Sequence, residues 1–74
     1  MKQTPDDIVL CAQFQELTRA SIARDVLLAE GIPAVIDNSV MGIVFPPAGA
    51  VRLMVRVADR DRAREILRQG ALLR

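Results

Sequence analysis

The stretch VRLMVRV, residues 51–57, decides the fold because it has the most regular alternation of side chains in the chain. Successive side chains of an extended strand point to opposite sides, so the three valines and the leucine share one face. Valine is β-branched, and β-branched side chains suit a pleated, half-buried surface. We therefore predict a central strand with one face on the core. The other face carries Arg52, Met54 and Arg56.

Upstream, residues 8–14 form a second predicted strand that is largely apolar on both faces. Its even-numbered residues are expected to share one side, and Val9, Cys11 and Gln13 the other. A strand that is apolar on both faces is typical of the middle of a covered sheet. We expect this strand to be central and covered on both sides.

Between these strands the apolar residues change to helical spacing. They recur every three or four residues over 17–30, which predicts a helix, and Gly31 is the glycine expected directly after a helix end. A short strand is predicted over 32–37. Its second residue, Pro33, belongs at the strand start or on an edge, because proline cannot donate to a sheet ladder.

After the central strand, residues 59–69 have the pattern of a second helix. Asp59 is a suitable N-cap residue, and Gly70 is expected to end the helix. Residues 71–74 are a short apolar tail, which could add a fourth strand.

This order of elements predicts one α+β domain over residues 1–74. Two right-handed βα crossovers joined by a hairpin give a ferredoxin-like sandwich, βαββα(β). In this fold two helices cover one face of an antiparallel sheet of three or four strands. The alternatives are a swapped dimer and a three-stranded sheet completed by a partner.

Charge and composition exclude several functional classes. Ten basic and nine acidic residues give a net charge of +1, which is too small to indicate binding to nucleic acid or to a membrane. One cysteine and no histidine argue against an intrachain disulfide and a zinc site. No signal peptide and no apolar run of about 18 residues is present, so we expect a cytoplasmic protein.

The sequence also argues against catalysis. It lacks histidine for acid–base chemistry, a catalytic triad, a cluster of metal ligands and a glycine-rich phosphate loop. We therefore expect no enzymatic activity, no cofactor and no metal. The hydrophobic content of 51% is high for so small a domain, and the excess indicates a subunit interface in a dimer or trimer.

The connection at residues 40–50 is the first candidate site. A hairpin connection is normally short and polar, but this one is long, apolar and uncharged. An exposed segment of this kind usually marks an interaction. The candidate partner- or effector-binding residues are Met41, Ile43, Val44, Phe45 and Pro46. Alternatively, the segment extends the hairpin and folds onto the open sheet face or onto a second copy.

The second candidate is the open sheet face. Its candidate binding residues are Arg52, Met54 and Arg56, which we expect to share the face with Val9, Cys11 and Val35. RNA-recognition modules bind through this face of a similar fold, but they stack bases on aromatic side chains, and this chain has only two phenylalanines and no other aromatic residue. A mixture of apolar and arginine side chains fits a dimer interface better.

The third candidate is the arginine stripe on the second helix, Arg60, Arg64 and Arg68. It could hold an acidic partner or a phosphate. The alternative, which we favour, is a solvated face with weak pairs between Asp61 and Arg64 and between Glu65 and Arg68.

The run LLAEGIPA, residues 27–34, preceded by Glu16 and Ala20, resembles the helix-to-strand signature of a small bacterial family of putative prokaryotic signal-transducing proteins. The strand at 51–55 and the helix after it are similar too, so the resemblance covers most of the chain. It implies a PII-like fold and effector binding near the loop between the second and third strands. It carries over no catalytic residues, and this loop lacks the basic and phosphate-cradling residues that a nucleotide would need.

We therefore predict a small regulatory or signal-transducing module. It would act by self-association and by binding an unidentified protein or small-molecule effector through residues 40–50. One alternative is a purely structural protein–protein interaction domain. The other is an enzyme of the dimeric ferredoxin-like barrel type with an apolar pocket.

Overall fold

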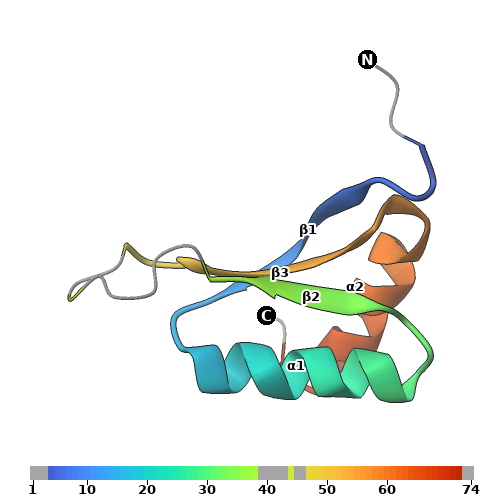
Figure 1. The fold of residues 1–74 in the computed structure, drawn as a ribbon. Coiled ribbons are helices and arrows are strands. Elements are labelled where there is room, and N and C mark those ends of the chain that lie inside the picture. Colours follow the sequence, from blue (N-terminus) through green and yellow to red (C-terminus); the bar gives the residue numbers. More distant parts are fainter. Residues whose placement is uncertain (1–3, 39–43, 45–46, 73–74) are drawn as a thin grey trace.

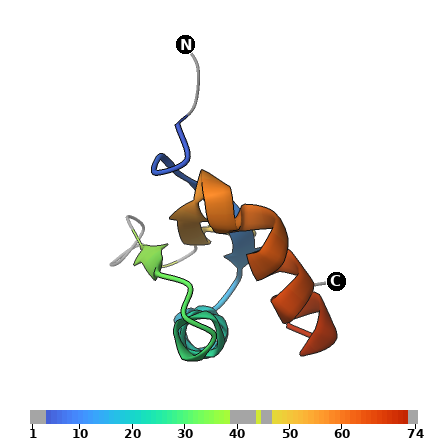
Figure 2. The same ribbon diagram turned by 90° about the vertical axis from the view of Figure 1, so that its right-hand side faces the viewer.

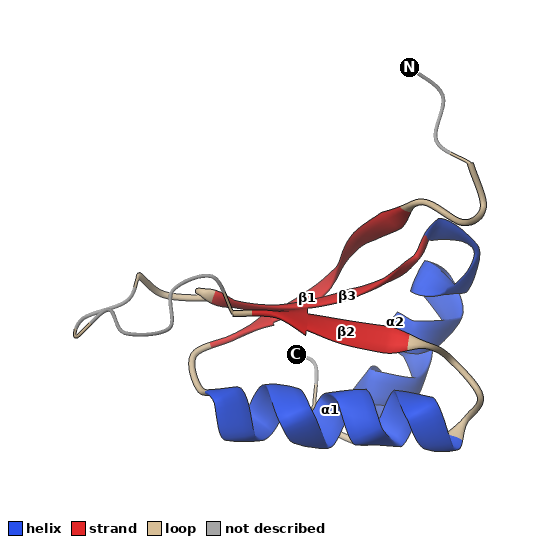
Figure 3. Ribbon diagram, viewed as in Figure 1, coloured by secondary structure: helices blue, strands red, loops and turns tan. Residues whose placement is uncertain are grey.

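The computed structural model describes residues 4–38, 44 and 47–72 (Figure 1). The elements are β1 (Ile8–Phe14), α1 (Leu17–Ala29), β2 (Ala34–Asp37), β3 (Val51–Arg56), the 3-10 turn η1 (Val57–Asp59) and α2 (Arg60–Gln69). The three strands form one antiparallel sheet in the order β1-β3-β2. This α+β arrangement is compatible with the predicted ferredoxin-like fold (Figure 3).

The central strand β3 has the predicted alternation. Val51, Leu53 and Val55 are all buried, while Arg52 is exposed and Met54 is half-buried. Because β3 pairs with a strand on each side, its alternation sets the two faces of the whole sheet. One face is packed on the core, and the other is the open face.

The position of β1 differs from the prediction. In the part of the chain that the structure describes, β1 pairs with β3 alone and lies at the edge of the sheet. A central β1 would need a fourth strand on its outer side. Ala71 and Leu72 form a turn and a bend instead, and residues 73–74 lie outside the described residues.

The predicted faces were wrong for the first half of β1, residues 8–11, and right for residues 12–14, because the register shifts in the middle of the strand. Leu10 pairs with Met54 and Ala12 pairs with Leu53, so Cys11 has no residue opposite it. An extra residue of this kind is a β-bulge, and it moves the side-chain alternation by one position. Cys11, predicted on the open face, is therefore buried in the core.

The other residues of β1 follow from the same shift. Val9, also predicted on the open face, pairs with Val55 on the covered face, and Leu10 takes its place on the open face. Both sides of β1 are apolar because its two halves present opposite alternations. This pattern does not require burial on both sides.

Both helices lie on the same side of the sheet (Figures 1 and 2). Helix α1 buries Ala20, Ala23 and Leu27 against it, and α2 buries Ala63 and Leu67. The alanines leave room for the helix backbones to approach, and the leucines fill the space that remains. Among the described residues, no helix is both long enough and apolar enough to cross a bilayer.

Helix α1 ends at the predicted glycine. The backbone N–H of Ile32 donates to the carbonyl oxygen of Leu27 at 2.9 Å, and the N–H of Gly31 donates to that of Leu28 at 3.0 Å. This pair of bonds is a Schellman motif, which requires a left-handed residue after the helix. Gly31 has φ +79°, a conformation that costs glycine little. The turn places Ile32 in the core.

Helix α2 ends with the same motif but a different residue. The N–H of Leu72 donates to the carbonyl oxygen of Leu67 at 2.8 Å, and the N–H of Ala71 donates to the carbonyl oxygen of Arg68 at 3.1 Å. The left-handed residue is Ala71, with φ 60°, and the predicted Gly70 lies one position earlier. An L-residue with a Cβ is strained in this conformation.

Candidate functional site: the open face of the sheet

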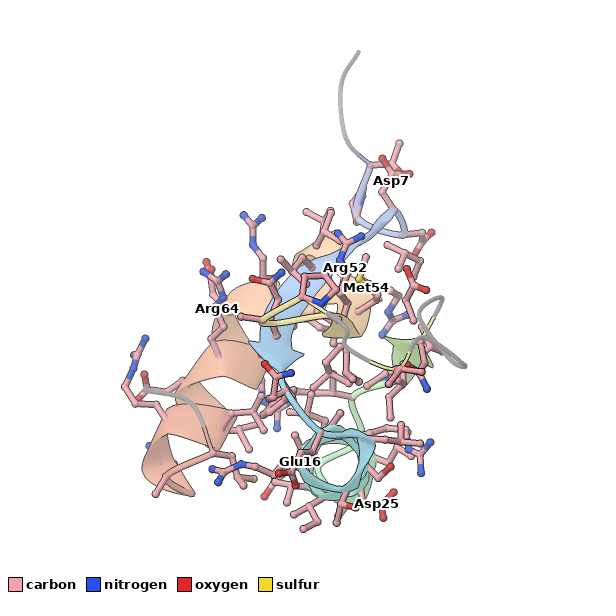
Figure 4. All side chains as sticks on the ribbon, turned by 90° about the vertical axis from the view of Figure 1, so that its left-hand side faces the viewer. Asp7, Glu16, Asp25, Arg52, Met54 and Arg64 are labelled. Atoms are coloured by element: carbon pink, nitrogen blue, oxygen red, sulfur yellow. The ribbon has the colours of Figure 1, made fainter. Side chains whose placement is uncertain are left out.

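Residues paired across the sheet point to the same side, so the register defines the open face. Met54 on β3 lies between Leu10 on β1 and Val35 on β2. We call these three residues the apolar row. Val35 is 56% exposed, and Leu10 and Met54 are half-buried, although neither α1 nor α2 covers them. Figure 4 shows Met54 and Arg52 on the side of the sheet opposite α1.

The next row toward the 38–50 connection is polar. Gln13, Arg52 and Asp37 are paired across the three strands. The Arg52 Nη1 atom lies 3.9 Å from Asp37 Oδ2, and both side chains are more than 40% exposed. An ion pair with this length and exposure is weak.

A second ion pair lies at the opposite end of β3, where the strand runs into η1. The Nε and Nη2 atoms of Arg56 donate to Asp59 Oδ2 at 3.0 and 2.8 Å. Asp59 does occupy the N-cap position of α2, as predicted, but its side chain makes no cap hydrogen bond. It ends the 3-10 turn η1 with helical backbone angles, whereas a capping residue is normally extended, and its Oδ2 atom accepts from Arg56. Each arginine of the open face therefore has an acidic partner, and the face carries no excess charge from these four groups.

The first candidate site is described only in part. Val44 is 79% exposed, which agrees with an accessible segment. The other candidates in residues 40–50, Met41, Ile43, Phe45 and Pro46, lie outside the described residues.

The chain returns from this segment beside the polar row. The N–H of Ala50 donates to the carbonyl oxygen of Pro47 at 3.2 Å, and Gly49 has φ +73°. A Cβ on Gly49 would lie 3.3 Å from the Cβ of Gln13, so the side chain of Gln13 packs closely over this glycine. The segment is thereby attached to the Arg52 end of the open face.

The arginine stripe on α2 is mostly engaged within the molecule. Arg68 Nη1 lies 2.9 Å from Glu65 Oε2, which confirms one of the two weak pairs predicted as the alternative. Arg64 differs from the prediction: its Nε donates to the backbone carbonyl oxygen of Cys11 at 3.0 Å. Sequence reasoning missed this contact because nothing near residue 11 in the sequence indicates a bulge.

Cys11 is a small buried residue of the core and takes no part in the open face. It is 1% exposed. Burial raises the pKa of its thiol, and the nearby Arg64 guanidinium lowers the pKa by a smaller amount. Among the residues that the structure describes, no three histidine, cysteine or acidic side chains gather as a metal site would require.

These features define a small α+β domain with one sheet face packed under helices and the other left uncovered by the elements that the structure describes. The chain belongs to the family described as "putative prokaryotic signal transducing protein", whose model matches residues 9–71. The match runs from β1 to the turn after α2 and confirms the resemblance found in the sequence. Neither the curated proteins nor the solved structures contain a match to the chain.

Proposed function

We propose that this protein is a small non-catalytic signalling module that works by protein association. Its first partner is a second copy of the chain, and the contact is made by the open face together with residues 40–50. The observation that carries the proposal is the apolar row, Leu10, Met54 and Val35, which crosses the sheet without a covering element among the described residues.

The energetics of this face support association. Burying apolar surface contributes roughly 25 cal/mol per Å², and an apolar centre with a polar rim is the usual layout of an interface. Ile8, which is 55% exposed and pairs with Arg56, adds to the apolar area. The rim consists of the two ion pairs described above.

The charge pattern also supports pairing with an identical surface. In a two-fold contact the same patch meets itself, so an excess of one charge would repel the second copy. Arg52 and Arg56 are each compensated by an acid of their own chain. An RNA partner is disfavoured by the same pairing, because arginines that contact phosphate must be available to it.

Two other functions remain as alternatives to be tested. A structural interaction domain would use the same face for a different protein and bind no effector. An enzyme of the dimeric ferredoxin-like barrel type would need acid–base groups, and this chain has no histidine to supply one.

The test is the molar mass in solution, measured by light scattering over a concentration series. The variant is Val35→Lys, which places a charge in the apolar row, and the control is Ile22→Lys on the outer side of α1. Ile22 is 49% exposed, close to the value for Val35, so the two changes remove similar exposed apolar surface. We expect the wild type and the control to form the same oligomer, and Val35→Lys to dissociate. A monomeric wild type, or equal behaviour of the two variants, would contradict the proposal.

Residues 40–50 need a separate variant. Replacing Ile43 and Phe45 together by serine should weaken association, or the capture of an effector, while the fold is retained. Circular dichroism checks the fold, and a thermal-shift panel of nucleotides and metabolites checks effector binding. If association and every ligand response were unchanged, this segment would have no part in the function.

A further inference from the structure

Strand β1 presents an exposed edge. It is seven residues long and pairs with β3 only, so in the described part of the chain no strand covers its outer side. An uncovered edge offers backbone N–H and carbonyl groups to any other extended segment. The edge strand of an identical molecule is a suitable partner, because two copies of one strand can pair antiparallel about a two-fold axis.

Arg64 lies at this strand. It projects from α2, which packs beside β1, and Figure 4 shows it on the side of β1 away from β2. Its Nε donates to the carbonyl oxygen of Cys11 at 3.0 Å across 53 positions of sequence, in a partly buried setting. Cys11 is the bulged residue near the middle of β1, with no residue opposite it on β3.

We infer that Arg64 prevents the outer edge of β1 from pairing with β1 of a second copy. The contact acts in two ways. A charged donor makes a stronger hydrogen bond than a neutral one, so the N–H of an incoming strand would have to compete with Arg64 for the carbonyl oxygen of Cys11. Two copies paired about the middle of β1 would also bring their two Arg64 guanidinium groups together, and like charges close to each other are destabilising.

The β-bulge at Cys11 also disfavours pairing at this edge. A bulge bends and twists its strand locally, which makes an edge a poorer template for pairing. In this chain the bulge also supplies the carbonyl oxygen that Arg64 holds. The inference concerns the edge of the sheet and holds whether or not the open face binds a second copy.

The experiment compares Arg64→Met with Arg68→Met. Methionine keeps an apolar stem of similar length and removes only the guanidinium. Arg68 lies one turn further along α2, and its partner is the exposed Glu65. Molar mass is measured by light scattering over a concentration series, and hydrogen exchange follows the amides of β1.

We expect Arg64→Met to reach at least twice the molar mass of the wild type at the same concentration, with slower exchange of β1 amides in those species. Pairing of the edges alone doubles the mass, and two interfaces on each molecule, a face and an edge, would build open chains. Arg68→Met should match the wild type. An Arg64→Met protein with the mass and the β1 exchange of the wild type would overturn the inference.

A loss of stability could also cause aggregation, so a third variant separates the two causes. Ile66→Val removes one methylene from a side chain that packs against the core from the same helix and leaves Arg64 in place. It should lower the melting temperature without new protection of β1. If Ile66→Val assembles as Arg64→Met does, loss of stability is the cause of assembly, and the proposed role of Arg64 is wrong.

Discussion

The two sides of β3 differ in what they contribute, although their residues alternate along one strand. On the covered side, Leu53 is fully buried between the helices and the sheet, and on the open side its neighbour Met54 is half-buried in the apolar row. The side chains on the covered side are removed from water, and their burial stabilises the fold. The open side is free to carry recognition, because most changes there leave the core intact.

Replacing one residue on each side should give the largest contrast. Leu53→Ala should lower the free energy of unfolding by about 3 kcal/mol, because it removes buried methyl groups and leaves a cavity. Met54→Ala should cost about 1 kcal/mol or less, since this side chain keeps contact with solvent. Urea unfolding of the three proteins measures both values. Equal losses would mean that the open side is covered in solution, and a concentration-dependent loss for Met54→Ala would identify the cover as a second copy.

The two helix ends provide a smaller contrast within the covered side. Gly31→Ala should destabilise by about 1 kcal/mol, and Ala71→Gly should stabilise by a similar amount, because a left-handed residue with a Cβ is strained. Nothing lies within 4 Å of a Cβ built on Gly31, so conformation alone is tested there. Thermal unfolding in opposite directions is the expected result. Shifts of the same sign would show that contacts, rather than backbone strain, decide these positions.

Cys11 allows the covered side to be tested by pH. Burial raises the pKa of its thiol, so the folded state retains the proton to higher pH than the unfolded state. This contribution to stability is complete below the unfolded pKa of about 8.5 and is lost as the pH rises through the folded value.

The free energy of unfolding should therefore decrease between neutral pH and about pH 10 in the wild type, and less so in Cys11→Ala. The background is small, because Lys2 is the only lysine and the chain has no tyrosine. Urea unfolding at several pH values measures the slope. Parallel pH profiles for the two proteins would place the thiol in contact with water.

The smallest effects are expected at the charged rim of the open side. Asp37→Asn should change stability by less than about 0.5 kcal/mol, because its pair with Arg52 is long and exposed. Asp59→Asn should cost more, about 1 kcal/mol, because Asp59 accepts two hydrogen bonds from Arg56 and is mostly buried. Thermal unfolding at low and high salt measures both. A larger effect at Asp37 would show that this end of the face is buried by association.

Most of the fold could be predicted from periodicity. The alternation at 51–57 identified β3 and its two faces, and Gly31 identified the end of α1. The end of α2 at Gln69 was predicted correctly, but the left-handed residue after it is Ala71 rather than the expected Gly70. Asp59 is the N-cap residue as predicted, but it makes no cap hydrogen bond, and the sequence does not show the 3-10 turn that gives it helical backbone angles.

The open face was predicted on β3 and misassigned on β1. Arg52, Met54 and Val35 follow from simple alternation, and the structure places them together. Leu10 was missed and Cys11 was wrongly included, because the bulge reverses the alternation between them. Whether a strand bulges depends on its pairing with β3 and on contacts such as that of Arg64, and neither is visible in seven residues of sequence.

The bulge has a consequence for how related chains should vary in length. The six ladder pairs of β1 with β3 use every residue of the strand except Cys11, so a chain without this residue could form the same six pairs as an unbroken strand. Cys11 then corresponds to a one-residue insertion in a six-residue strand. Among relatives, a gap at this position should occur together with loss of the arginine at position 64, because the carbonyl oxygen that Arg64 holds would be absent.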